Sequence, residues 1–251
     1  MGGSSSGNLA GPPDLLEDLV LTVICPSRGR PGAAAEVMKT FKDTAVDLDS
    51  RLYFVIDPDD HTGDHYPNDL EEPSVQTYRL EQKPALGGML PPLNMAIKDP
   101  WVLPPGVTVV GFVGDDHRFR TPGWDAAIDD YLEEHPGVAY GDDLLQRQNL
   151  PTQWFVSRPI VEAFGMGLPT LRHLFIDDYW KTFASAAGCL YYMPDIVIEH
   201  MHPTVGKAEW DDSYRANNAP EMYQSDRAAF EAWRANQMAA DVEVLRGLVR
   251  P

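Results

Sequence analysis

Short apolar runs that end in polar turns alternate along this chain with segments of helical periodicity. Residues 19–26 are apolar and β-branched and end in the Gly- and Pro-containing turn 27–32, a pattern typical of a buried strand followed by a loop. Apolar residues at 34, 37, 38 and 41 then mark one face of a helix. Residues 51–57 form a second apolar run, which ends in an acidic turn. This order of strand, helix and strand predicts a βαβ unit.

The rest of the chain continues the alternation. Residues 85–99 join a Gly-Gly turn to a short helix, and residues 107–113 are the most strand-like run in the sequence. Thr121 as N-cap and Pro122 at the first helical position predict the start of another helix. Further strands are expected over 137–143 and 190–203, and helices over 175–188 and 226–248. Residues 153–164 are expected to form a strand that continues into a helix. The last helix is expected to turn Phe230, Trp233, Val242, Leu245 and Leu248 inward.

Alternating strands and helices predict an α/β fold, in which the ligand site lies beyond the carboxyl ends of the strands. We expect one main domain over 18–205 and a helical extension over 206–251 that packs on it. Residues 1–17 lack the basic start and apolar stretch of a signal peptide, and we expect them to form a flexible leader.

Composition narrows the classes of function. The chain has 251 residues, of which 43% are hydrophobic and 23% charged, as is usual for a globular protein. Its net charge of −18 disfavours binding to a nucleic-acid backbone or an anionic membrane. Both cysteines, Cys25 and Cys189, lie in apolar runs, which predicts buried thiols and a cytoplasmic protein. No apolar run approaches the roughly 18 residues of a membrane-spanning helix, so no membrane partner is expected.

One candidate site follows the apolar run 107–113. Asp115, Asp116 and His117 come directly after it. Adjacent carboxylates repel each other, and a divalent cation relieves that repulsion. Carboxylate oxygens suit Mg²⁺ or Mn²⁺, and an imidazole shifts the preference toward Mn²⁺. The alternative is an acidic turn that precedes the next helix, since aspartate is common in turns.

Three other polar groups have two interpretations each. His200 and His202 project to one side if they end a strand, where one of them completes a metal site or both are merely solvated. Asp177 and Asp178 begin a predicted helix, where they favour its N-terminus or supply a general base. The arginines at 28 and 30 bind phosphate groups or pair with the many carboxylates of the chain.

In this order, the clusters resemble the GT-A fold glycosyltransferases and are similar to glycosyltransferase family 2, especially its small bacterial and phage-type members. In that family the first strand ends in a Pro-containing loop at the nucleotide, as residues 22–31 do, and the second ends in an acid, as at Asp57. A Gly-rich segment followed by Asn matches Gly88 and Asn94. The family's Asp-x-Asp metal motif resembles residues 114–117, although Val113 stands where an acid is commonest.

The resemblance implies a Rossmann-like mixed sheet flanked by helices, and it implies roles for particular residues. The nucleotide of the donor would be bound by Pro26, Ser27, Arg28, Arg30, Asp57, Gly88, Asn94 and Asp115. A metal ion would be held by Asp116 with Asp115 or His117, and by His200 or His202. The acidic pair before the acceptor helix matches Asp177 and Asp178, with Asp178 in the place of the catalytic base.

The implied activity is metal-dependent transfer of a hexose from a nucleotide sugar, with UDP-sugars favoured, to an acceptor hydroxyl with inversion. The implied cofactor is Mn²⁺ or Mg²⁺. The acceptor is open, and a modified DNA base, a protein and a glycan are candidates, in the host cytoplasm if the chain is phage-encoded. The alternatives are a sugar-phosphate nucleotidyltransferase and a non-catalytic carbohydrate- or cation-binding protein.

Overall fold

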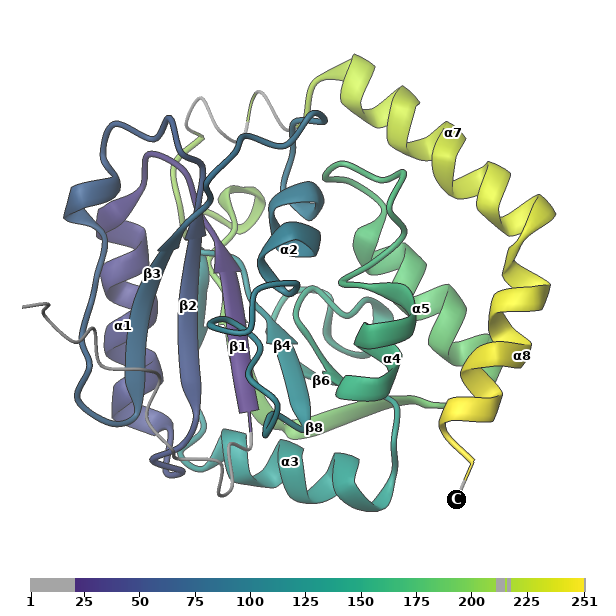
Figure 1. Ribbon diagram of the computed structural model, residues 1–251, viewed down its shortest axis with the longest axis horizontal. Helices are drawn as coiled ribbons and strands as arrows, with labels where there is room; N and C mark the ends of the chain where they lie inside the picture. Colours follow the sequence, from purple (N-terminus) through teal and green to yellow (C-terminus); the bar gives the residue numbers. More distant parts are fainter. Residues whose placement is uncertain (1–20, 211–214, 216–217, 251) are drawn as a thin grey trace, which may run out of the picture.

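The computed structural model describes residues 21–210, 215 and 218–250, and these form a mixed eight-stranded sheet flanked by helices (Figure 1). The strands are β1 (Leu21–Pro26), β2 (Arg51–Ile56), β3 (Ser74–Arg79), β4 (Val109–Phe112), β5 (His117–Phe119), β6 (Val138–Asp142), β7 (Trp154–Ser157) and β8 (Leu190–His200). They lie in the order β3-β2-β1-β4-β7-β6-β8-β5. The first four are parallel, while β7 runs antiparallel to both its neighbours and β5 runs antiparallel to β8. The predicted α/β fold class is confirmed.

Helices cover both faces of the sheet. Helices α1 (Pro31–Thr44) and α3 (Trp124–Glu134) pack on one face. The other face is covered by α2 (Leu90–Ala96), α4 (Arg158–Phe164) and α5 (Ile176–Ala187). Helices α7 (Pro220–Asn236) and α8 (Met238–Leu248) pack on the outside of this layer, against α4 and α5. Strand β1 shows why two cores form, because Val23 and Cys25 point toward α1 while Ile24 between them points toward α2. Short 3₁₀ turns occur at Gly63–His65, Arg147–Asn149 and Pro203–Val205.

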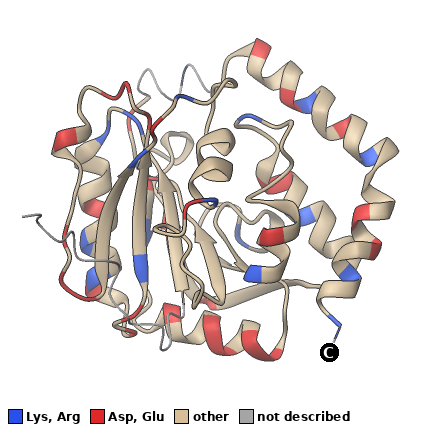
Figure 2. Cartoon of the chain, in the orientation of Figure 1, with Lys and Arg blue, Asp and Glu red and all other residues tan. Residues whose placement is uncertain are grey.

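The outer surface reflects the negative charge of the chain. Figure 2 shows acidic residues along α3 with no Lys or Arg on that helix. Among the described residues, no helix is both long and apolar enough to cross a membrane. Cys25 and Cys189 are buried free thiols, as expected. The expected leader lies outside the described residues.

Two predicted helix boundaries are wrong. Helix α3 begins at Trp124 with Gly123 in the left-handed region as its N-cap, and not after Thr121. The Thr121 hydroxyl instead accepts the Val197 N–H (2.9 Å) and donates to the Asp195 carbonyl. The hydroxyl that was expected to cap the helix is therefore bound to strand β8. The predicted helix over 226–248 is two helices, α7 and α8, that meet at Gln237.

The break at Gln237 has a packing reason. Trp233 Nε1 donates to Asp241 Oδ2 (2.8 Å) across the turn, and Val242 and Leu245 of α8 are buried in the same core as α5. Leu248 is only partly buried. The structure also contains β3 and β5, for which no strand was predicted, and ends β8 at His200, three residues earlier than expected.

Candidate functional site

The site begins with a tight turn between β4 and β5. His117 N–H donates to the Gly114 carbonyl (3.0 Å), and Gly114 N–H donates to His117 Nδ1 (3.0 Å). A Cβ atom at Gly114 would lie 2.5 Å from Asp116 Oδ1, so the turn leaves no room for a side chain there. These contacts hold Asp116 and His117 next to the carboxyl ends of β1 and β4.

Strand pairing adds His200 to this turn. His117 and His200 are register partners in the antiparallel β5–β8 pair, and their rings stack with centroids 4.4 Å apart at 19°. Asp116 contacts both imidazoles, with Oδ2 3.2 Å from His200 Nε2 and Oδ1 3.3 Å from His117 Nδ1. Ligand atoms of the three residues lie within 4.8 Å of one another. We call Asp116, His117 and His200 the Asp-His cluster.

The Asp-His cluster has strongly shifted titrations. Burial lowers the pKa of His200, but its hydrogen bond and charge interactions with Asp116 and Asp143 outweigh burial and raise that pKa to about 9. Burial and the positive charge of His200 lower the pKa of His117. Burial raises the pKa of Asp116, but the two imidazoles outweigh it and hold the pKa well below the usual range. Without a metal ion, a protonated His200 therefore neutralises the Asp116 carboxylate.

Asp143 is a site residue that the sequence reasoning missed. Its Oδ2 lies 3.9 Å from His200 Nδ1, and its Oδ1 accepts the N–H groups of Leu145, Gln146 and Arg147. The signal was present in the sequence, because Gly141, Asp142 and Asp143 at the end of one predicted strand repeat the Gly-Asp-Asp order of residues 114–116. Asp143 thus connects the loop after β6 to the Asp-His cluster.

The acidic pair lies in the first turn of α5. Burial raises the pKa of Asp177 to about 7, with His200 acting to lower it and the charges of Asp178, Asp143 and Asp116 acting to raise it. Asp177 is therefore within the electrostatic field of the Asp-His cluster. Both acids are half-buried, and their place at a helix N-terminus also stabilises their negative charge.

Asp115 faces away from the Asp-His cluster toward the loop after β1. Its Oδ2 accepts the Ser27 hydroxyl (2.6 Å) and its Oδ1 pairs with Arg30 Nη1 (2.7 Å). Burial raises the pKa of Asp115 to about 6, and Arg30 opposes that shift. The Tyr66 hydroxyl lies 3.0 Å from Ser27 Oγ and accepts the Arg30 N–H. Ser27, Arg30 and Asp115 are thus brought together as the sequence predicted.

The second arginine of that loop faces the end of β2. Arg28 Nη1 lies 2.6 Å from both Asp57 Oδ2 and Asp59 Oδ1, and Lys83 Nζ lies 2.7 Å from Asp59 Oδ2. Residues 26–30, Asp57 and Asp115 therefore line one edge of the sheet. Arg28 and Asp57 both belong to the predicted donor site, and here they form an ion pair.

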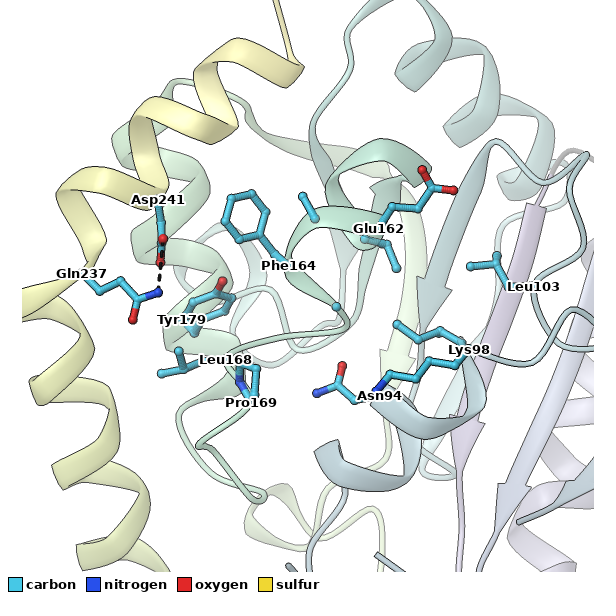
Figure 3. Close-up of a pocket in the computed structure, with 14 residues that line it drawn as sticks. Asn94, Lys98, Leu103, Glu162, Phe164, Leu168, Pro169, Tyr179, Gln237 and Asp241 are labelled. Atoms are coloured by element: carbon cyan, nitrogen blue, oxygen red, sulfur yellow. Dashed lines mark hydrogen bonds between the residues drawn. The ribbon is translucent and has the colours of Figure 1, made fainter. Parts of the chain in front are cut away.

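Gly88 and Asn94 make contacts of a different kind. Gly88 has φ 109°, and a Cβ there would lie 2.4 Å from the Arg172 carbonyl oxygen. Asn94 Oδ1 accepts the Met166 N–H (2.8 Å). Asn94 also lines a pocket of about 460 Å³ between α2, α4, α5 and the α7–α8 turn, where Tyr179 and Asp241 also lie (Figure 3). No residue of the Asp-His cluster lines that pocket.

His202 lies beyond the end of β8. Its Nδ1 accepts the Thr204 N–H (3.2 Å), which caps the turn Pro203–Val205. Its ring centroid is 5.1 Å from that of His200 and 6.1 Å from that of Trp210. The structure therefore places His200 inside the Asp-His cluster and His202 beside it.

Comparison with known proteins identifies the fold. No family model matches the chain, and no curated protein matches it in sequence. The mannosyltransferase PcManGT from Pyrobaculum calidifontis, in complex with GDP-Man and Mn²⁺, is 12% identical, with 91% of this chain and 79% of that chain covered at a TM-score of 0.54. TarS 1–349 of S. aureus in complex with UDP-GlcNAc is also 12% identical, with 88% of this chain and 69% of that chain covered at a TM-score of 0.58. The chain has the fold of these proteins, and the expected glycosyltransferase fold is confirmed.

Proposed function

We propose that the protein is a metal-dependent glycosyltransferase that moves a sugar from a nucleotide sugar to an acceptor hydroxyl. The observation that carries this proposal is the partly buried Asp-His cluster at the carboxyl ends of the strands. Ligands of α/β sheets bind at this edge. The likeness to PcManGT, whose structure holds GDP-Man and Mn²⁺, supports the same use of the fold here.

The residues of the Asp-His cluster fit a divalent cation. They offer one carboxylate and two imidazoles, a donor set that suits Mn²⁺ better than Mg²⁺. Among the described residues, His117 Nε2 and His200 Nδ1 are buried and have no hydrogen-bond partner. When bound, the ion would stabilise the negative charge that develops on the departing diphosphate. Asp115 is committed to Ser27 and Arg30, which leaves Asp116 as the carboxylate ligand.

The donor nucleotide is assigned to the loop 26–30 with Asp57 and Asp115. Arg28 and Arg30 bring positive charge to an otherwise acidic edge, and phosphate groups are good partners for guanidinium. A UDP-hexose is the proposed donor. Gly88 and Asn94 are proposed to help bind it, as the family resemblance implies. TarS holds UDP-GlcNAc and PcManGT holds GDP-Man, so both nucleotides belong in the test.

The acidic pair supplies the base that takes the proton of the acceptor hydroxyl, with inversion at the sugar. The resemblance points to Asp178, whereas burial beside the Asp-His cluster favours Asp177, whose pKa is raised to about 7. A general base is most effective when its pKa is near the working pH. We therefore assign the base to Asp177, with Asp178 as the alternative.

The acceptor is proposed to be a hydroxyl of a modified DNA base, a protein or a glycan. Trp210 is exposed near His202 and offers an aromatic face for stacking on a sugar or a base. A cytoplasmic location, in an infected host if the chain is phage-encoded, agrees with two buried free thiols.

The test is release of nucleoside diphosphate from UDP-GlcNAc, UDP-glucose and GDP-mannose, with Mn²⁺ and without it. We expect Mn²⁺-dependent release from the wild-type chain, its loss in Asp116→Ala, and its retention in Asp130→Ala, an exposed acid of α3. Pyrophosphate release from a nucleoside triphosphate and a sugar phosphate would instead show a nucleotidyltransferase. Binding of Mn²⁺ without turnover of any donor would favour a cation-binding protein.

A further inference from the structure

Helix α7 holds the segment that leads into α5. The Asp226 side chain on α7 is fully buried, and its carboxylate accepts three backbone N–H groups in a row. Oδ1 accepts from Arg172 (3.2 Å), and Oδ2 accepts from His173 and Leu174, both at 2.8 Å. A buried carboxylate is costly unless its oxygens are satisfied, so this geometry ties α7 to one conformation of the loop.

The same helix holds the next residue by its side chain. Phe175, the N-cap of α5, has φ 62°, a left-handed conformation that is uncommon for a residue with a bulky side chain. Its ring stacks on Phe230 at 5.7 Å and lies 5.2 Å from the ring of Tyr223, and both partners belong to α7. Strained backbone persists only where its surroundings enforce it, and here α7 supplies those surroundings.

The segment 172–175, which α7 holds, contacts residues near the proposed site on both of its sides. Downstream, the Tyr179 N–H donates to the Phe175 carbonyl (2.9 Å), so the conformation of Phe175 sets the first turn of α5 with its acidic pair. Upstream, the Arg172 carbonyl accepts the Leu90 N–H (2.9 Å) next to Gly88, and Arg172 Nε donates to the Gly87 carbonyl. The loop thus joins the start of α5 to the glycine turn before α2.

We propose that Asp226 is a positioning residue for the transfer reaction, which acts by fixing residues 172–175 and through them the acidic pair of α5. This inference rests on the proposed function. It makes the C-terminal extension, which carries no residue of the Asp-His cluster, part of the machinery that orients the base. Geometry matters at this level because a displacement of about 1 Å from a remote change can lower a rate about 100-fold.

The chain offers a matched control for the stability cost of losing such a carboxylate. Asp125 is also fully buried, and its carboxylate accepts Val46 N–H, Asp47 N–H and the Ser50 hydroxyl at 3.0–3.1 Å. It holds the loop between α1 and β2 from α3, on the opposite face of the sheet. Asp125→Ala and Asp226→Ala therefore remove equivalent bonds at two places, of which only one adjoins the proposed site.

The experiment compares both alanine variants with the wild-type chain by donor turnover and by amide hydrogen exchange. Both variants should lower the melting temperature by similar amounts. Asp226→Ala should reduce kcat for Mn²⁺-dependent release of nucleoside diphosphate from UDP-GlcNAc or GDP-mannose about 10- to 100-fold, with a smaller change in KM. Asp125→Ala should stay within about threefold of wild type. Mn²⁺ affinity should be unchanged in both variants, because the Asp-His cluster lies on other elements.

Hydrogen exchange tests positioning separately from activity. The Tyr179 amide should lose protection in Asp226→Ala and keep it in Asp125→Ala. If Asp226→Ala does not fold, Asp226→Asn replaces it, since the amide oxygen still accepts from His173 and Leu174 while its NH₂ faces the Arg172 N–H. Unchanged protection at Tyr179, or equal loss of turnover in the two alanine variants, would overturn the proposal. A wild-type chain that turns over no donor would refute the proposed function, and the exchange result would still decide whether Asp226 positions α5.

Discussion

Asp116 Oδ2 lies 3.2 Å from His200 Nε2, although the two residues are 84 positions apart in the sequence. The antiparallel pair β5–β8 creates this contact, and the stacked ring of His117 completes the Asp-His cluster.

Without metal, the protein should lose stability as the pH rises above neutrality. The folded pKa of His200 is about 9, above its unfolded value of 6.5, because its interactions with Asp116 and Asp143 outweigh burial. The native state then holds a proton that the unfolded state has released, so the contribution is fully present below about pH 6.5 and lost through pH 9. The loss across this window is about 3 kcal/mol.

Urea unfolding between about pH 7.5 and 9.5 in the presence of a chelator measures the upper part of this loss. Asp177 titrates below that window, since its folded pKa is about 7. His200→Gln should flatten the slope. An unchanged slope in that variant would assign the pH dependence to other groups.

Mn²⁺ affinity should increase with pH over the same interval. A metal-bound imidazole must be deprotonated, and the raised pKa of His200 means that the proton has to leave first. Calorimetric titration in buffers of different ionisation enthalpy would show the released proton.

The two neighbouring histidines provide a matched pair for the same titration. His200→Ala should weaken Mn²⁺ binding at least about 10-fold, while His202→Ala should have a small effect, because His200 belongs to the Asp-His cluster and His202 lies outside it. The reverse ranking would place His202 in the metal site.

Asp177→Asn should lower turnover by about 10² to 10⁴, the usual worth of a general base, and Asp178→Asn should lower it less. The amide keeps the shape of the side chain but does not take the proton. At saturating Mn²⁺ the wild-type rate should rise with pH as Asp177 loses its proton, and this rise should be absent in Asp177→Asn.

Donor dissociation constants of both variants serve as the control and should remain near the wild-type value. Full activity in Asp177→Asn with loss of activity in Asp178→Asn would show that Asp178 is the base. Equal losses would mean that the pair acts as a unit.

Gly141→Ala should destabilise the fold by about 1–3 kcal/mol. A Cβ there would lie 2.3 Å from the Ile196 carbonyl oxygen of β8, so the β6–β8 pair would have to separate. The register shifts between Gly141 and Asp142, just before Asp143 approaches His200. Gly247→Ala on α8, where a Cβ meets nothing within 4 Å, is the control and should be neutral or stabilising. Equal urea midpoints for the two variants would contradict this account.

Local patterns were enough to predict much of the fold. The apolar runs at 21–26, 51–56 and 109–112 are strands, and the polar residues that follow them lie at one edge of the sheet. The helix start at Thr121 was wrong because strand β8 binds its hydroxyl, and the break at Gln237 was missed because Trp233 and Asp241 stabilise the turn. In both places a contact from elsewhere in the fold overrode a local preference.

The sequence by itself determined which side chains stand at the ends of strands, since this depends on apolar runs and on the polar residues that follow them. It placed Asp116 beside His117, because the two are neighbours in the chain. Only the tertiary structure decided that His200 faces Asp116, that Asp143 lies behind His200, and that Asp226 holds the start of α5. Strand partners and the docking of α7 depend on the packing of distant segments, and local periodicity contains no information about which segments those are.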